Sequence, residues 1–574
     1  MPAANPPSAL TVSVSEVLRT LDHEKSSLAR GIAEGRYALW LGSAISRERV
    51  ADLSDVLLRV LEFLQVNVDP TATGCPFKRA LDEALALAEL GDGVRATIDT
   101  STSVRTWPHL DAILHNLVGK YSSVLDISLP GQPPDYLLWT AVDIEMTYGS
   151  SKNPDCEHMC IAVLIHEGAF PEIASANWDG LIEEAVHQIS PRDDLMRVCV
   201  LPKDFQEPTR PSRLLKFHGC AVRAVDDPRT YRDALVGRES QITNWPNVST
   251  MMRNQVVDLA TTRPTLMIGL SGQDSDIRDV FSKARQLVPW PWPSDPPAQV
   301  FAEDAIAHNQ SAILRLVYGA DAYAAARANI DSGALVRAYG KPLLTAIVLH
   351  TVAQKLKALV RTVEAPSLDD SGLDELEGGI TCLRDQVARL ADGDRNSFIR
   401  AFIEREGRLV AILQAGALDP ATVGHYRPLS RGSIGQIPIE PSNATSGFRE
   451  FAAALALLGL AESDGTCTIT LAPRGSANEG SVEVSTRARA SVRLFLVVDE
   501  AAVARLTATG AVSDADEDAV IVYARGPAPR LRRTPTRRKG RLGRPTLRTL
   551  GVAEALEACV DLPDLRRRFK EAVL

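Results

Sequence analysis

The sequence predicts an α/β protein whose main domain is a doubly wound, Rossmann-like parallel sheet. Four short apolar segments read as buried strands, near residues 37–41, 172–176, 213–218 and 264–269. Each ends in a polar or Gly/Ser turn, and helical patterns separate them along the chain. Strands that alternate with helices over such distances are typical of a parallel sheet covered by helices on both faces.

The chain of 574 residues is too long for a single core, so we expect several regions. Apolar residues at helical spacing predict a helix over 14–35, before the first strand. After about residue 360 the pattern changes, and 363–379 reads as an acidic linker. The expected regions are an α/β domain over 1–360 with a helical insertion at about 50–170, a helical linker region over 361–440, a smaller α+β domain over 441–524, and a basic tail with a terminal helix over 525–574.

The α+β region has a pattern that two local structures explain. Residues 448–475 resemble the last helix and wing hairpin of a winged-helix domain, with "LAPRG" where such wings often carry "LTPRG". An ordinary helix–hairpin corner fits the pattern almost as well. Residues 491–524 then read as strand, helix and strand.

Composition favours a globular protein of the cytoplasm. Hydrophobic residues make up 45% and charged residues 24%, which is ordinary for globular chains. We see no apolar run near the ~18–20 residues that cross a bilayer and no secretory signal at the start. The eight cysteines are scattered through a long chain, which indicates reduced thiols rather than a disulfide framework. We therefore expect a cytoplasmic protein without membrane contact.

Charge is unevenly distributed. The net charge is −9, yet residues 525–548 contain nine Arg, one Lys and no acidic residue. Four prolines interrupt this stretch and prevent a continuous helix. Three interpretations stay open: a solvated tail, a nonspecific site for nucleic acid phosphates, or a contact with a protein partner.

Small and polar residues follow each predicted strand. Because ligands of doubly wound sheets bind outside the carboxyl ends of the strands, we expect these residues to share one crevice. The first turn has the backbone N–H groups that cradle a pyrophosphate, and a β-branched side chain at Gly42 is expected to disfavour a positive φ there and to block the phosphate. The four segments are Gly42-Ser43-Ala44-Ile45-Ser46, Ser175-Ala176-Asn177-Trp178-Asp179, Lys216-Phe217-His218-Gly219, and Gly269-Leu270-Ser271 with Asp274 and Asp276 after it.

In this order the four segments resemble the sirtuin motifs G-A-G-x-S, T-x-N-x-D, K-x-H-G and G-T/Y-S. The resemblance covers roughly residues 30–290, and is to the divergent bacterial branch that hydrolyses NAD+ in antiphage defence. Ala44 replaces the second glycine of the first motif, so that turn must differ somewhat. The resemblance implies that Gly42, Ser43, Ala44, Ser46, Gly269 and Ser271 bind NAD+.

Asn177 and His218 are the candidate catalytic residues. Asn177 is an uncharged donor and acceptor that can hold ribose hydroxyls or a water beside the anomeric carbon. His218 is the candidate general base, because imidazole titrates near ~6.5; a hydrogen-bonded core histidine is the alternative. Trp178 is expected to pack in the core.

Three aspartates have two interpretations each. Asp179 either contacts NAD+ or starts the helix that follows it. Asp274 and Asp276 either receive adenosine ribose hydroxyls or cap the next helix.

Zinc chemistry and ATP hydrolysis are not indicated. Zinc-containing sirtuins carry two C-x-x-C pairs after the catalytic histidine, whereas only Cys220 lies there in this chain, so we expect no zinc. The cluster "CEHMC" at 156–160 is too tightly spaced for a tetrahedral site and reads as part of a helix. The chain has no phosphate-binding loop of the G-x-x-x-x-G-K-[ST] type.

The resemblance implies an NAD+ glycohydrolase that acts in antiphage defence by abortive infection. Unregulated NAD+ loss kills the host, so we expect control through homo-oligomer assembly or through a partner such as a HerA-type ATPase or an Argonaute-like protein. The alternatives are an NAD-dependent deacylase or ADP-ribosyltransferase, and a non-enzymatic nucleic-acid-binding or scaffold protein.

Overall fold

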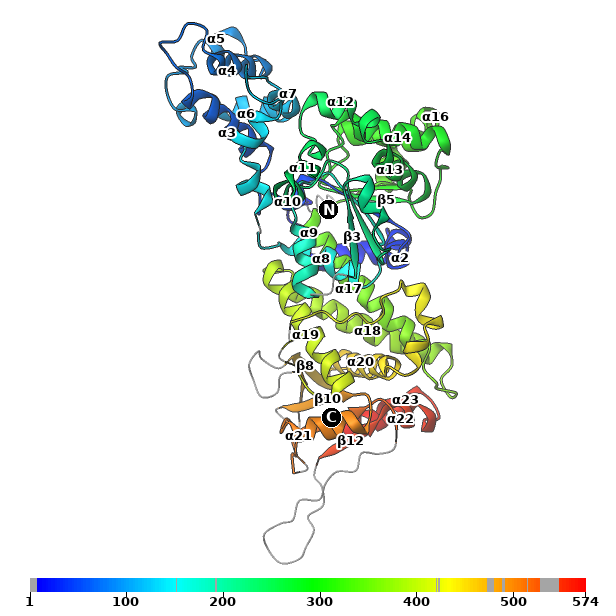
Figure 1. Ribbon diagram of the computed structural model, residues 1–574. Coiled ribbons are helices and arrows are strands. Elements are labelled where there is room, and N and C mark those ends of the chain that lie inside the picture. The colour runs from blue at the N-terminus through cyan, green and yellow to red at the C-terminus, as the bar shows by residue number, and fades with distance from the viewer. Residues whose placement is uncertain are drawn as a thin grey trace, which may run out of the picture.

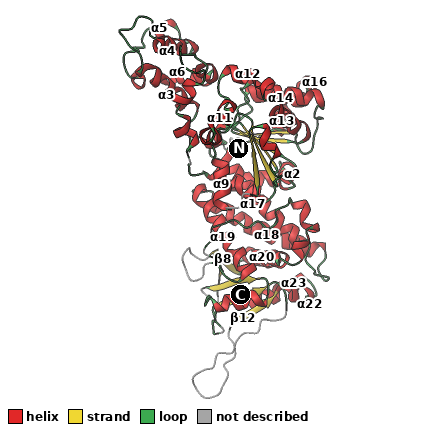
Figure 2. Cartoon of the chain, viewed as in Figure 1, coloured by secondary structure: helices red, strands yellow, loops and turns green. Residues whose placement is uncertain are grey.

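The computed structural model describes residues 8–150, 152–190, 194–419, 421, 424–471, 480–487, 491–513, 515–526 and 547–574. These residues form an elongated molecule (Figure 1). A parallel sheet with its helices lies in the middle, a helical insertion projects at one end, and a smaller sheet lies at the other end (Figure 2).

The main sheet has seven strands in the order β3-β4-β2-β1-β5-β6-β7, and every neighbouring pair is parallel. This confirms the predicted doubly wound parallel sheet. The strands are β1 (Ala38–Leu41), β2 (Glu172–Ser175), β3 (Met196–Cys199), β4 (Ser212–Lys216), β5 (Thr265–Ile268), β6 (Gln299–Ala302) and β7 (Leu335–Val336).

Alternating residues of the central strand divide the core into two parts. Ala38 and Trp40 point to one face of the sheet, whereas Leu39 and Leu41 point to the other, and all four are buried. This double burial explains why the strand reads as a continuous apolar run. One face is covered by α1 (Val14–Asp22), α2 (Ser26–Ala33), α8 (Cys156–His166), α9 (Leu181–Ile189) and α17 (Gly340–Val360), and the other by α12 (Glu239–Val248), α13 (Thr250–Thr262), α14 (Ser275–Leu287), α15 (His308–Tyr318) and α16 (Ala320–Gly333).

One helix corrects the expectation that no segment is apolar enough to cross a bilayer. α17 has 21 residues and is, by length and composition alone, long and apolar enough to cross a membrane. However, 72% of its most apolar window is buried inside the protein, and the helix packs against α8, α1 and α18 (Asp370–Ala391). A helix that is apolar all round is found in a protein core as well as in a membrane, and α17 is a core helix here.

The helical insertion lies between β1 and α8. Its longest helices are α3 (Leu53–Val66), α4 (Pro76–Leu87) and α6 (Leu110–Val118), and the short helix α7 (Tyr121–Leu125) follows. Their apolar residues join the core on the α14 side of the main sheet. The insertion therefore packs against the α/β domain rather than forming a separate core.

The second sheet confirms a smaller C-terminal α+β region. It has five strands in the order β12-β11-β10-β9-β8. The elements are α20 (Phe448–Ser463), β8 (Cys467–Leu471), β9 (Val482–Thr486), β10 (Val492–Val497), α21 (Glu500–Ala508), β11 (Ala519–Tyr523), β12 (Arg548–Gly551), α22 (Val552–Ala558) and α23 (Leu562–Val573).

The helix–hairpin pattern is present, but the hairpin is not a free wing. β8 and β9 are antiparallel, and β9 continues the sheet by pairing with β10. β11 and β12 then add in parallel, which makes a mixed sheet. The ordinary helix–hairpin interpretation fits this arrangement better than the winged-helix one. Most of "LAPRG", residues 472–475, lies outside the described residues.

The predicted acidic linker is wrong from Asp370 onward. Asp369 Oδ1 accepts the N–H of Gly372 and caps the long helix α18 (Asp370–Ala391). α18 packs closely on α20, because Gly379 and Gly459 allow the two backbones to meet; a Cβ at Gly379 would lie 2.1 Å from the carbonyl oxygen of Ala456. The apolar spacing on this helix was hidden by its many acidic residues.

Most of the basic stretch, residues 527–546, lies outside the described residues. Its two ends belong to the folded region. Arg525 donates to Glu450 Oε1 at 2.7 Å, and Arg548 starts β12. The chain therefore returns to the same sheet after the basic stretch.

Candidate functional site

The main sheet brings the four motifs to one edge. β4, β2, β1 and β5 are neighbours in that order, and Leu41 pairs in register with Ser175 and Ile268, and Ser175 with Lys216. The residues that follow these strand ends, namely Gly42, Asn177, His218 and Gly269, therefore lie along the carboxyl edge, where ligands of this fold bind.

Two of the motifs pack directly against each other. Gly42 has an extended backbone (φ −122°), and a Cβ there would lie 2.3 Å from the carbonyl oxygen of Gly269. Gly269 has φ +68°, which favours glycine, and its carbonyl accepts the N–H of Ala44 at 3.4 Å. Gly42 is thus required for a close approach between loops rather than for a positive φ. Ser43 is exposed beside this contact, and Ser271 is exposed on the neighbouring loop.

Asn177 presents a free acceptor. Its side chain is buried, and Nδ2 donates to Oγ of Ser46 at 3.4 Å. Its carbonyl oxygen Oδ1 has no hydrogen-bond partner among the described residues. A buried amide oxygen without a partner is uncommon in folded proteins, and it marks a position where a ligand hydroxyl or a water can donate.

His158 holds Ser46 from the other side. Nε2 of His158 lies 3.1 Å from Ser46 Oγ, and its Nδ1 accepts the backbone N–H of Asp155 at 3.2 Å. Because Nδ1 is an acceptor, Nε2 carries the proton and donates to Ser46. Burial lowers the pKa of His158 and keeps this imidazole neutral.

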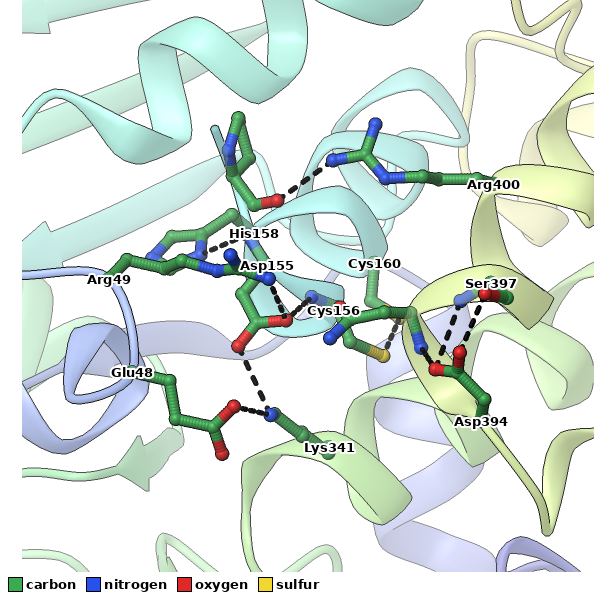
Figure 3. Close-up of polar contacts among 12 residues, drawn as sticks. Glu48, Arg49, Asp155, Cys156, His158, Cys160, Lys341, Asp394, Ser397 and Arg400 are labelled. Atoms are coloured by element: carbon green, nitrogen blue, oxygen red, sulfur yellow. Dashed lines mark hydrogen bonds and ion pairs between the residues drawn. The ribbon is translucent and has the colours of Figure 1, made fainter. Parts of the chain in front are cut away.

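Sequence analysis missed this role of His158. The helical interpretation of "CEHMC" is correct, since these residues form the first turn and a half of α8, and Cys156 and Cys160 lie 3.9 Å apart on it. Figure 3 shows His158 beside Asp155 and Arg49. The signal was available: α8 runs into β2, so its first turn has to lie at the carboxyl edge of the sheet.

His218 is held by Asp276. Nε2 of His218 lies 2.7 Å from Oδ2 of Asp276, and both side chains are buried. Oδ1 of Asp276 accepts the N–H of Ile277 and is fixed at the start of α14. Burial opposes the charged imidazole, but the charges of Asp276 and Asp274 outweigh it and raise the pKa of His218. The ribose contact of Asp276 stays a prediction. Its contact with His218, the candidate base, is a role that the sequence did not indicate.

Asp274 links the site to the helical insertion. Its Oδ1 accepts the hydroxyl of Tyr121 in α7 at 3.2 Å. Burial raises the pKa of the Asp274 carboxyl, and the charge of Asp276 adds to this effect. The ribose contact predicted for Asp274 is not tested by these contacts.

Asp179, Lys216 and Trp178 have structural contacts. Oδ1 of Asp179 accepts the N–H of Leu181 at 3.1 Å, as expected for the start of α9. The buried ammonium of Lys216 donates to the main-chain oxygen of Asp179 and lies 2.9 Å from Glu183 Oε1. The indole of Trp178 donates to the carbonyl of Val236 and packs edge-on against Tyr148, so the core-packing prediction is confirmed.

One group of side chains has the composition of a metal site. Ligand atoms of His218, Asp274 and Asp276 all lie within 4.8 Å of one another. Two of these side chains, His218 and Asp276, are already hydrogen-bonded to each other, so we assign the group to histidine positioning. All eight cysteines are free thiols. The absence of zinc stays a prediction.

The parallel sheet and its edge loops define a Rossmann-like α/β protein, a class that commonly binds nucleotides. Residues 171–311 match the family model of the SIR2-like domain. The chain therefore carries a sirtuin-like domain, and domains of this kind use NAD+. The matched segment contains Asn177, His218 and Asp276, whereas the loop after β1 precedes it. No curated protein matches the chain.

Proposed function

We propose that the protein is an NAD+ glycohydrolase, which cleaves the bond between nicotinamide and ribose and transfers the ribosyl group to water. The observation that carries the proposal is the unpartnered Oδ1 of Asn177 at the same edge as the His218–Asp276 pair. The family match supports NAD+ chemistry in general, and the choice of water as acceptor is ours.

Cleavage of the nicotinamide–ribose bond needs no strong general acid. Nicotinamide leaves from a cationic pyridinium and takes the bonding electrons as a neutral molecule, so positive charge moves to the ribose ring, as in glycoside hydrolysis. Asn177 Oδ1 accepts a hydrogen bond from the attacking water or from a ribose hydroxyl and fixes its position. A neutral amide is also less readily trapped by the cationic ring than a carboxylate.

His218 is the proposed general base. With Nε2–H donated to Asp276, its Nδ1 carries the lone pair and takes a proton from water or from a ribose hydroxyl. Asp276 fixes the orientation of the ring and stabilises the imidazolium that forms. The products are nicotinamide, ADP-ribose and one proton.

We propose further that this activity serves antiphage defence in the cytoplasm and is silent until it is triggered. Homo-oligomer assembly, a HerA-type ATPase and an Argonaute-like protein are the candidate triggers. The reason is physiological: an unregulated NAD+ hydrolase is toxic to its host.

The test is incubation of the full chain with NAD+, alone and with candidate activators, with mass spectrometry of the products. We expect free nicotinamide and ADP-ribose. Acyl-ADP-ribose or ADP-ribosylated protein would instead identify a transferase. Asn177→Ala and His218→Ala are each expected to lower the rate by ~10²–10⁴. The exposed Asn247→Ala and His308→Ala are matched controls, and full activity in either site variant contradicts the assignment.

A further inference from the structure

A basic hollow of about 380 Å³ opens beside the loop that follows β1. Its walls come from the loop after β1 and from the helical insertion, namely from residues 47–51, three residues of α3, Arg105, Met146, Thr147 and Lys152. Its charged residues are Arg47, Arg49, Arg59, Arg105 and Lys152, with Glu48 and Asp55. Neither Asn177 nor His218 lines it.

The acidic residues of the basic hollow already have partners. Glu48 pairs with Lys341 at 2.7 Å (Figure 3), and the carboxylate of Asp55 accepts the backbone N–H of Asp52 at the start of α3. The ion pair with Lys341 offsets the charge of Glu48, whereas the backbone N–H does not offset that of Asp55; the cations of the basic hollow still outnumber its acidic residues.

Three of the cations lack an acidic partner. In the part of the chain that the structure describes, no carboxylate lies within 4.0 Å of Arg47, Arg59 or Lys152. Arg59 donates to the carbonyl of Val142 and to Thr147 Oγ1, and Lys152 donates to the carbonyl of Met146. These contacts orient the two side chains without neutralising them, which leaves a concave surface with an excess of positive charge.

A chain of contacts joins the basic hollow to Asn177. Arg49 donates to Asp155 Oδ1 at 3.2 Å, and its Nε is buried without a partner among the described residues. Asp155 and His158 cap α8 together (Figure 3), and His158 holds Ser46, which in turn holds Asn177. A ligand that takes the guanidinium of Arg49 competes with Asp155 at the first link of this chain.

We propose that the basic hollow binds a small phosphorylated anion and that this ligand changes how Asn177 is held. Guanidinium groups form short, charge-assisted hydrogen bonds with phosphate oxygens, and several around one hollow suit a ligand with two or more negative charges. The volume fits a free small molecule. The coupling to Asn177 rests on the proposed function, whereas binding of the anion does not.

The first experiment measures binding of inorganic pyrophosphate to the full chain by calorimetry at constant ionic strength. We expect the natural chain to bind pyrophosphate. The double variant Arg47→Ala/Lys152→Ala should have an affinity at least ~10-fold lower, because it loses charge-assisted contacts. Arg19→Ala/Arg327→Ala, which removes two exposed arginines elsewhere, is the matched control. No binding, or equal binding by both double variants, overturns the proposal. So does binding that saturating ADP-ribose abolishes, because the anion then occupies the crevice.

The second experiment tests the coupling without turnover. If the anion changes how Asn177 is held in the proposed NAD+ crevice, then by thermodynamic linkage it must also change the affinity of the crevice for ADP-ribose. We expect pyrophosphate to change the affinity for ADP-ribose several-fold in the natural chain and to have no such effect in Arg49→Gln. An unchanged affinity in the natural chain overturns the coupling. If ADP-ribose does not bind at all, the proposed function fails while the first experiment still decides whether the anion site exists.

Discussion

Oδ2 of Asp276 lies 2.7 Å from Nε2 of His218, and this contact sets the protonation of the candidate base. The imidazolium form of His218 is stabilised because its pKa is raised by the charges of Asp276 and Asp274 against the effect of burial. Only the neutral form has a lone pair, so the rate of NAD+ cleavage should fall as the pH drops through the raised pKa.

Asp276→Asn is therefore expected to shift the pH profile. Without the carboxylate, burial dominates and lowers the pKa of His218, so the acidic limb of kcat/KM should move to lower pH. The plateau should also drop by ~10–100-fold, because the ring loses its orienting acceptor. Asp279→Asn is the matched control, since Asp279 lies on the same helix and pairs with Arg253. An unshifted acidic limb would show that Asp276 does not act through His218.

A second prediction concerns the hydroxyl of Ser46, which accepts from both His158 and Asn177. Ser46→Ala leaves these two donors without their common acceptor, so the amide of Asn177 is free to rotate. We expect kcat to fall by ~10–100-fold with a smaller change in KM, by analogy with residues that do not touch the ligand but hydrogen-bond to the side chains that do. Steady-state kinetics of Ser46→Ala and of Ser311→Ala on α15 measure the effect. Equal kinetic constants for the two variants would remove Ser46 from the site.

The sequence was sufficient for the strands that carry the motifs and insufficient for the others. β1, β2, β4 and β5 are buried on both faces or nearly so, and each has an apolar centre, which ranges from two residues in β2 and β4 to four in β1. β3 at the edge is only partly buried in its first three residues, and β7 has two residues. Such short or half-polar strands are defined by pairing with neighbours, which a single sequence does not display.

The candidate site divides in the same way. Motif order along the chain predicted that Asn177 and His218 share an edge, because parallel strands end together. The contacts His218–Asp276 and His158–Ser46 join segments 58 and 112 residues apart. Neither spacing follows a local period, so such partners depend on how helices pack onto the sheet.

A third prediction concerns Gly42. The expectation of a positive φ was wrong, since φ is −122°. The side-chain space is filled by the backbone of Gly269, so even Gly42→Ala forces the two loops apart. We expect a loss of stability of ~1–3 kcal/mol, typical of overpacking, together with weaker ADP-ribose binding.

Thermal unfolding and calorimetry of Gly42→Ala test this expectation. Gly93→Ala is the control, because nothing lies within 4 Å of an added Cβ at Gly93. A Gly42→Ala variant that keeps both its melting temperature and its affinity would show that the loops separate without cost.

The last prediction concerns the basic stretch, whose residues 527–546 lie outside the described residues. Truncation after Ala524 is a poor test of this stretch, because it also removes β12, α22 and α23. β12 pairs with β11, and the buried side chains of Leu556, Leu565 and Phe569 complete the core of the smaller domain. We expect that truncation to unfold the C-terminal region.

Replacement of 527–546 by a Gly/Ser linker of equal length leaves this core intact. If the stretch binds nucleic acid, the natural chain should bind DNA of any sequence with an affinity that falls steeply with salt, and the linker variant should lose this binding. A change of oligomer mass without a salt-dependent DNA complex would identify a protein contact instead. DNA affinity across a salt series, mass by light scattering and NAD+ cleavage, measured on both chains, separate these outcomes. If all three are equal, the eight cations of 527–546 are a solvated segment and both binding interpretations are wrong.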